Sequence, residues 1–450
     1  MSNSALSVVE FLLTAHAYSD DRRFDEDDLP AEYRKVFWEG GSIERPLAVT
    51  EGRAREATGV AEPWEAISDL LFTQGEEFSG ALSLSDPELA AEWFAKRADE
   101  KRLAANPTLS GFYEDRGIDV PVDYERAREN ARPIQADRVW IDNLLATYFD
   151  PDDEEEAEML DLVDIRAPEE IEMTLDDLVL TEGQEAEIAK IVKAIEHREY
   201  LAQIGLREIG KLLFVGPPGT GKTTTSRALA HDLDLPFVEV KLSMITSQYL
   251  GETAKNVDKV FEVAKRLSPC ILFIDEFDFV AKTRRSDEHA AIKRAVNTLL
   301  KSIDEVSLIQ DDVLLIGATN HPDQLDAAAW RRFDEIVNFP KPDEGMRADI
   351  LTVITREMDI TGFDPEEIAA ETEGLTGSDL RMVLREAVLE ALTENRRTLT
   401  QRDLLDAVTD FEERDTLKDL DMIEGDHEAL VAGGSPGDGH DHDHDHDHDH

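Results

Sequence analysis

The chain has 450 residues, enough for about two to four domains that each bury a core of their own. Asp and Glu number 100 against 47 Lys and Arg, a formal net charge of −53, which disfavours binding to nucleic acids and anionic membranes because both are held mainly through Lys and Arg. Cys270 is the only cysteine, so no disulfide can form within the chain, and no apolar run is long enough to span a bilayer. We therefore expect a soluble cytoplasmic protein without nucleic-acid or membrane partners.

Composition and periodicity divide the chain into five segments. Residues 1–149 are predicted to form a mainly helical N-terminal domain, and residues 150–174 an acidic linker. Residues 175–344 alternate strands with helices, and residues 345–412 read as a small helical unit. Residues 413–450 form an acidic tail that ends in a His-Asp repeat and is expected to be disordered.

The N-terminal domain carries no catalytic motif. Its amphipathic stretches include Pro87 to Ala105 and Tyr124 to Tyr148. We interpret four tryptophans as anchors of one small core rather than as a ligand-binding aromatic cluster: Trp38, Trp64, Trp93 and Trp140. We expect this domain to bind client proteins or an adaptor protein.

The middle of the chain is predicted to be an α/β fold, with a parallel sheet covered by helices on both faces. Its strands are expected at Lys211–Val215, Phe237–Val240, Cys270–Ile274 and Val313–Gly317. Alternating strands and helices imply right-handed crossovers, and the ligand of such a sheet binds beyond the carboxyl ends of the strands. The lone Cys270 is then a buried strand residue.

A glycine-rich loop, residues 216–223, joins the first of these strands to a helix. Its glycines allow the backbone N–H groups to face one concavity, and the helix N-terminus adds a positive dipole end, so a polyphosphate fits there. Lys222 is expected to reach the β- and γ-phosphates and Thr223 to bind Mg²⁺. The assigned nucleotide-binding residues are Gly216, Pro217, Pro218, Gly219, Thr220, Gly221, Lys222, Thr223 and Thr224.

Polar residues follow the later strands at the same expected edge. Asp275 and Glu276 come directly after an apolar strand, where Asp275 can hold Mg²⁺ and Glu276 can polarise the attacking water. Asn320 follows the next strand and can contact the γ-phosphate or position that water. Further on, Arg331 and Arg332 are either a solvated pair or an arginine finger that completes the site of a neighbouring subunit.

With these motifs in place, residues from about Leu175 to Glu412 resemble an AAA+ ATPase of the classical AAA clade. The resemblance identifies residues 216–223 as Walker A, residues 271–276 as Walker B, Asn320 as sensor 1, and the stretch through Arg332 as the second region of homology. It implies Mg-dependent ATP hydrolysis. The small helical unit then resembles the four-helix lid of the family, where Gly377 and Ser378 approach the nucleotide.

The family also carries an aromatic pore loop, and residues 248–252 with Tyr249 match it in position and pattern. A second pore loop is expected around residues 284–288, where a solvated charged loop is an equal alternative. The resemblance implies a homo-oligomeric ring, commonly of six subunits, whose pore loops pull on protein clients.

The extreme acidity resembles that of proteins from salt-loving archaea, with an acidic surface for a basic client as the alternative. The favoured function is ATP-driven remodelling or unfolding of proteins. The alternatives are a nucleotide-dependent assembly scaffold and a proteasome-associated regulatory ATPase, and a nucleic-acid motor is disfavoured by charge.

Overall fold

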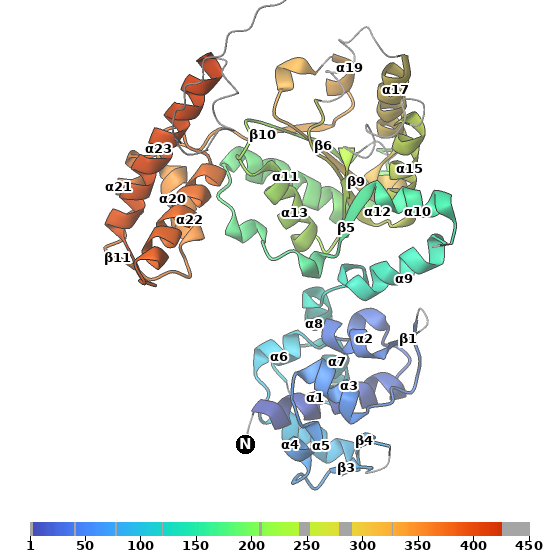
Figure 1. The fold of residues 1–450 in the computed structure, drawn as a ribbon. Helices are drawn as coiled ribbons and strands as arrows, with labels where there is room; N and C mark the ends of the chain where they lie inside the picture. Colours follow the sequence, from blue (N-terminus) through green and yellow to red (C-terminus); the bar gives the residue numbers. More distant parts are fainter. Residues whose placement is uncertain are drawn as a thin grey trace, which may run out of the picture. The chain divides into compact units, whose positions relative to one another are not determined.

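The computed structural model describes residues 3–39, 42–76, 79–118, 120–150, 152–206, 209–242, 253–278, 290–325 and 327–424. The chain forms two compact units, Met1–Lys341 and Pro342–His450. The first unit contains the predicted N-terminal domain and the α/β fold, and the second contains the small helical unit (Figure 1).

The N-terminal region is helical and has a hydrophobic core of its own, built around α1, Asn3–Asp20. Three predicted tryptophan anchors, Trp38, Trp64 and Trp93, pack against this core, whereas Trp140 does not belong to it. Short strands pair as two hairpins, β1 (Trp38–Glu39) with β2 (Ser42–Ile43) and β3 (Thr73–Gly75) with β4 (Leu82–Leu84). The other helices are α2 (Ala31–Phe37), α3 (Glu51–Thr58), α4 (Pro63–Ile67), α5 (Pro87–Ala95), α6 (Glu100–Ala104), α7 (Pro107–Asp115) and α8 (Tyr124–Asn130).

A six-stranded sheet organises the rest of the first unit, in the order β10-β6-β9-β8-β7-β5. Five strands are parallel and β5 is antiparallel to β7. Three predicted strands are confirmed to the residue, and the fourth continues to Thr319. The strands are β5 (Val163–Arg166), β6 (Lys211–Val215), β7 (Phe237–Val240), β8 (Cys270–Ile274), β9 (Val313–Thr319) and β10 (Glu335–Asn338).

Alternate residues of the central strands face opposite sides of the sheet, so each strand contributes to two cores. On one face, Leu213, Leu272 and Leu315 pack with α15 (Thr253–Arg266) and α17 (Ala290–Glu305). On the other, neighbouring strand residues pack with α11 (Glu182–Glu196) and α13 (Lys222–Asp232). The described part of this unit also contains the short helices α12 (Arg198–Gln203), α18 (Leu308–Asp311) and α19 (Ala327–Trp330). The predicted sheet with helices on both faces is thus confirmed (Figure 1).

The prediction of a solvated linker over residues 150–174 is wrong for most of that stretch. Its acidic run forms α10 (Glu154–Asp161), whose carboxylates pair with Lys259 and Arg266 of α15. Strand β5 then extends the sheet, and Met159 and Val163 join its core. The preceding helix α9 (Arg138–Tyr148) also contributes Leu144 and Leu145 to that core. The α/β part therefore begins before residue 149, because α9, α10 and β5 all contribute apolar residues to its core.

The second unit is a helical bundle with its own core, formed by α20 (Glu344–Ile354), α21 (Pro365–Ala370), α22 (Gly377–Thr393) and α23 (Gln401–Glu424). A short parallel pair, β11 (Ile360–Thr361) and β12 (Leu399–Thr400), ties two connections together. The final helix runs twelve residues beyond the predicted end at Glu412, so the tail is not disordered from residue 413.

Candidate functional site

The phosphate-binding loop lies between a fully buried strand, β6, and helix α13. Gly219 and Gly221 adopt positive φ angles of 77° and 98°, which side chains rarely tolerate. Gly216 is required for another reason, because a Cβ atom there would lie 2.0 Å from the carbonyl oxygen of Phe339. The glycines thus allow the loop to turn sharply and to lie close to the sheet edge.

Lys222, the first residue of α13, is buried beneath this loop. Its Nζ donates hydrogen bonds of 2.8 Å to the carbonyl oxygens of Gly216 and Pro217. Burial lowers the pKa of Lys222, and the negative charge of Asp275 opposes this shift. The loop carbonyls and Asp275 therefore favour a charged ammonium at the centre of the phosphate loop.

Thr223 links the loop to the neighbouring strand ends. Its hydroxyl donates a hydrogen bond of 2.9 Å to Oδ2 of Asp275, which follows β8. A hydroxyl and a carboxylate held this closely are oxygen ligands of the kind that Mg²⁺ prefers. The two residues that the sequence assigns to the metal are thus in contact.

Glu276 leaves the strand in an unusual conformation, with a positive φ of 46° and an exposed side chain. Its N–H donates a hydrogen bond of 2.7 Å to Oδ1 of Asp275. A left-handed conformation in a residue other than glycine costs on the order of 1 kcal/mol and clusters at functional sites. The side chain of Glu276 is thus exposed at the end of the strand, where a reacting water could approach it.

Asn320 lies at the same edge because β9 runs between β6 and β8 in parallel with both. It is half-buried and directly follows Thr319, the last residue of the strand. The topology therefore brings together the phosphate loop, Asp275, Glu276 and Asn320.

Two residues that the sequence analysis did not assign fix this edge. The hydroxyl of Thr319 donates a hydrogen bond of 3.1 Å to Oδ1 of Asp278, and both residues are buried. Thr319 Oγ1 also accepts a hydrogen bond of 3.1 Å from the N–H of His321. This network ties the turn that carries Asn320 to the turn that carries Glu276. In the sequence, Asp278, the second aspartate of the Asp275–Asp278 stretch, is the feature that could have indicated this network.

Arg331 and Arg332 lie elsewhere, at the amino end of β6. Asp334, two residues after Arg332, is hydrogen-bonded to Lys211, the first residue of that strand. Since β6 spans Lys211–Val215 and a strand rises about 3.3 Å per residue, this edge is about 15 Å from the phosphate loop. The structure therefore does not bring the arginine pair to the nucleotide-binding edge of its own chain.

The two arginines differ in their surroundings. Arg332 is half-buried, donates from Nε to the carbonyl oxygen of Leu300 at 3.0 Å, and pairs with Asp304 at 3.1 Å. Both partners belong to the last turns of α17, where the helix dipole also favours a cation. Arg331 is exposed. Of the pair, Arg331 is thus the residue whose side chain is presented to solvent.

Gly377 and Ser378 begin α22 of the second unit. The cap of this helix is Thr376, because its hydroxyl accepts from the N–H of Asp379 while the Asp379 carboxylate accepts from the N–H of Thr376. Tyr249 and the expected second pore loop at 284–288 lie outside the described residues.

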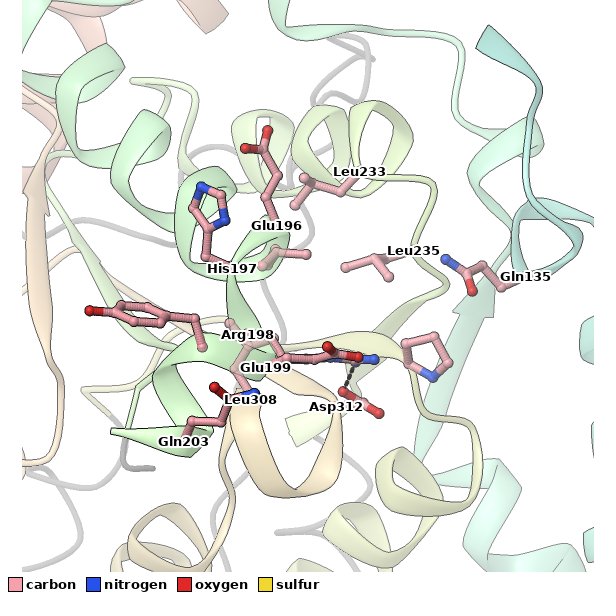
Figure 2. Close-up of a pocket in the computed structure, with 13 residues that line it drawn as sticks. Gln135, Glu196, His197, Arg198, Glu199, Gln203, Leu233, Leu235, Leu308 and Asp312 are labelled. Carbon is pink, nitrogen blue, oxygen red and sulfur yellow. Dashed lines mark hydrogen bonds and ion pairs between the residues drawn. The ribbon is translucent and has the colours of Figure 1, made fainter. Parts of the chain in front are cut away.

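A cavity of about 710 Å³ lies at the amino edge of the sheet, away from the phosphate loop (Figure 2). Figure 2 shows Leu233 and Leu235 on one side of it and the ion pair of Arg198 with Asp312 on the other. Most of its polar residues come from the end of α11 and from α12, and Gln135 and Asp312 add two more. None of the predicted nucleotide-binding residues lines this cavity.

Comparison with known proteins identifies the family of this fold. Residues 212–341 match the ATPase family associated with various cellular activities (AAA), and residues 362–406 match the AAA+ lid domain. Over 242 residues the chain is 39% identical to an uncharacterized AAA family ATPase, y4kL, of Sinorhizobium fredii, with 54% of this chain and 72% of that protein covered. The chain belongs to the AAA ATPase family. It is accordingly an ATP-hydrolysing enzyme, and its second unit contains the AAA lid.

Proteasome-activating nucleotidases are further relatives of this AAA ATPase. The chain is 39% identical over 235 residues to that of Pyrococcus horikoshii and 35% identical over 246 residues to that of Methanococcus maripaludis. These matches cover 50% and 54% of this chain, and 59% and 60% of the respective relatives. Among the helices that the structure describes, none is both long enough and apolar enough to cross a bilayer.

Proposed function

We propose that this AAA ATPase assembles into a ring, commonly of six subunits in its family, and uses ATP hydrolysis to remodel or unfold protein clients. The observation that carries the ring is the position of Arg331 and Arg332 at the sheet edge opposite the phosphate loop. The exposed Arg331 lies about 15 Å from the phosphate loop of its own chain, a position that suits an action on the ATP of a neighbouring chain. The matching relatives named for activating a proteasome support protein as the client.

Within one site, each residue at the nucleotide-binding edge has its own role in binding or hydrolysing ATP. Lys222 binds the β- and γ-phosphates, and its ammonium moves from the loop carbonyls to the phosphate oxygens. Thr223 and Asp275 hold Mg²⁺, which neutralises charge on the phosphates when bound. The carboxylate of Glu276 accepts a proton from the attacking water, and the Asn320 amide orients that water.

The neighbouring subunit completes this site. Arg331 is exposed and free to extend across a subunit boundary, and Arg332 fixes the turn beside it through α17. A guanidinium supplied in this way stabilises the charge that develops on the transferred phosphoryl group, with a rate effect on the order of 10³ to 10⁵. Hydrolysis then depends on assembly.

Coupling to the client is assigned to Tyr249. The support for it is the sequence pattern of residues 248–252, a polar loop with one large ring beside a glycine. A tyrosine ring buries area against almost any side chain, which suits a motor that grips varied sequences. In the lid, Gly377 and Ser378 are assigned to the ribose and base of the nucleotide.

The experiment that separates a motor from an assembly scaffold measures ATP hydrolysis with and without a permanently unfolded protein. A motor is stimulated by it, and Tyr249→Ala removes the stimulation while leaving ATP binding intact. Tyr249→Phe keeps the stimulation, since the grip is mainly apolar. A wild-type ATPase that ignores unfolded protein would favour the scaffold.

A proteasome-associated role is the second candidate, favoured by the similarity to proteasome-activating nucleotidases. Degradation of a folded protein by a purified 20S proteasome core, with ATP and with or without this ATPase, tests it. Degradation that needs the ATPase and fails with Glu276→Gln supports the association. If the ATPase neither changes the rate of degradation nor binds to the proteasome core, the association is contradicted.

A further inference from the structure

Two buried phenylalanines stand next to residues assigned to ATP hydrolysis. Phe277 follows Glu276, and Phe333 follows Arg332. Their exposed fractions are 0% and 8%. Their rings meet edge to face, with centroids 5.2 Å apart and an interplanar angle of 88°. This contact connects the turn at the nucleotide-binding edge with the arginine turn at the opposite edge.

Gly317 makes this contact possible. It lies in β9, paired with Leu213 on one side and Ile274 on the other. A Cβ atom at Gly317 would lie 3.1 Å from Cζ of Phe333, 3.2 Å from its Cε1 and 3.3 Å from Cδ1 of Leu213. Because the strand offers no side chain here, the ring of Phe333 lies across it and reaches Phe277.

Both ends of the contact are held by the backbone. The N–H of Phe277 donates a hydrogen bond of 2.7 Å to the carbonyl oxygen of Ala318 in β9. On the other side, Asp334 is bonded to Lys211 of β6. A close-packed interior passes on small displacements instead of absorbing them. A continuous series of packed and hydrogen-bonded groups therefore leads from the arginine turn to Phe277 and the strained backbone of Glu276.

We propose that Phe277 and Phe333 are positioning residues that couple the arginine pair of one subunit to the catalytic glutamate of the same subunit. When Arg331 engages the nucleotide of the neighbour, Phe333 moves with its turn and shifts Phe277, which sets the direction of Glu276. Occupancy of one ATP site thereby adjusts hydrolysis at the next. This coupling rests on the proposed role of the arginines between subunits.

A double-mutant cycle on kcat tests the coupling, with wild type, Arg331→Ala, Phe333→Leu and the double variant. Phe333→Leu is expected to lower kcat about threefold to tenfold, with the Kd for ATP unchanged. In the Arg331→Ala background the same substitution should lower kcat no further. Without the Arg331 side chain, no contact with the neighbouring nucleotide shifts the turn that carries Phe333. A residue that only fills the core would lower kcat by the same factor in both backgrounds.

Two further variants guard against a trivial loss of folding. Phe237→Leu is the matched control, since Phe237 is fully buried and stacks on Phe273 on the other face of the same sheet, with centroids 5.4 Å apart. It should cost similar thermal stability and leave kcat unchanged. Gly317→Ala should displace the Phe333 ring by a few tenths of an ångström and lower kcat only when Arg331 is present.

The outcomes separate the coupling from the function on which it rests. If Arg331→Ala lowers kcat and Phe333→Leu lowers it again by the same factor, the coupling is overturned and the role of the arginine stands. If Arg331→Ala keeps the wild-type kcat, both are overturned. If Phe237→Leu lowers kcat as much as Phe333→Leu does, the effect is general core loss and the coupling is overturned.

Discussion

Lys211 and Asp334 bond to each other in both directions. The N–H of Lys211 donates a hydrogen bond of 2.9 Å to Oδ2 of Asp334, and the N–H of Asp334 donates one of 2.8 Å to the carbonyl oxygen of Lys211. This reciprocal pair anchors the turn that carries Arg331 to the first residue of the strand that leads to the phosphate loop. The Asp334 carboxylate is thus one of the groups that hold the arginines in position, beside the contacts of Arg332 with α17.

Replacement of that carboxylate should weaken hydrolysis without affecting ATP binding. Asp334→Ala leaves the Lys211 N–H without its acceptor, which costs about 1 kcal/mol of stability or more and loosens the arginine turn. Asp334→Asn keeps an oxygen acceptor and should behave almost as wild type. Steady-state kcat and the Kd for ATP check this, and equal defects in both variants would contradict it.

ATP binding and hydrolysis should fail separately at two residues of the nucleotide-binding edge. Lys222→Ala removes the cation that the loop carbonyls hold in place, so ATP binding should be lost. Glu276→Gln keeps the exposed side chain but not the base, so ATP should bind while hydrolysis falls roughly a hundredfold or more. Calorimetric binding and phosphate release distinguish the two. Wild-type turnover by Glu276→Gln would show that another residue is the base.

Substitutions of the two arginines should have different effects on thermal stability, and both should lower kcat. Arg332→Ala removes contacts with Leu300 and Asp304 and should lower the melting temperature, whereas Arg331→Ala removes an exposed side chain and should not. Arg331→Ala should still lower kcat on the order of 10³-fold if it acts on a neighbour. Thermal melting and ATPase assays on the same preparations compare them.

Mixed rings test on which chain Arg331 acts. Arg331→Ala and Lys222→Ala chains are each inactive, yet a mixed ring contains interfaces with an intact phosphate loop from one chain and an intact Arg331 from the other. Some ATPase activity should therefore return on mixing. Rings that mix, as judged by two affinity tags, and recover nothing at any ratio would remove the support for action between subunits.

The lid should lose stability in acid through Asp403. Hydrogen bonds from Arg396 and Thr400 lower the pKa of Asp403 from 3.8 to about 2. A lowered pKa in the folded state means that the stabilisation is complete above about pH 4 and is lost as the pH falls towards 2. Asp403→Ala should cost about 1 kcal/mol at neutral pH, because it removes the acceptor of the Thr400 N–H and the partner of Arg396.

Chemical unfolding at several pH values measures this difference. The gap between wild type and Asp403→Ala should be constant from pH 5 to 7 and shrink below pH 4. Asp406→Ala is the matched control, because its partner Arg402 is 3.6 Å away and both side chains are exposed. A gap that stays constant down to pH 3 would contradict the assignment.

The sequence predicts the nucleotide-binding edge because its strands are short apolar runs that end in polar residues. β6 and β8 are buried at every position, so their limits are visible as changes of composition. β5 is different, since Val163 alternates with charged residues on an edge strand, and the acidic run before it hides the signal. The carboxylates of α10 form ion pairs with Lys259 and Arg266 only in the folded chain, because these residues are distant in the sequence.

Contacts between distant segments could not be read from the sequence either. The bond between Thr319 and Asp278 exists because β8 and β9 are neighbours, and the partner of Arg332 is a backbone carbonyl that no residue pattern marks. The opposite placement of Arg331 and the phosphate loop likewise follows from the register of β10 on β6. These are the features on which the proposed action between subunits depends.

The most direct test of the account follows the unfolding of a tagged fluorescent protein by the assembled ATPase. With ATP, the wild-type chain should abolish the fluorescence, and Glu276→Gln should not. Tyr249→Ala should hydrolyse ATP and fail to unfold the substrate, with Tyr249→Phe close to wild type. Unfolding by Tyr249→Ala at the wild-type rate would contradict threading through this loop, and no unfolding by any variant, including wild type, would favour the scaffold.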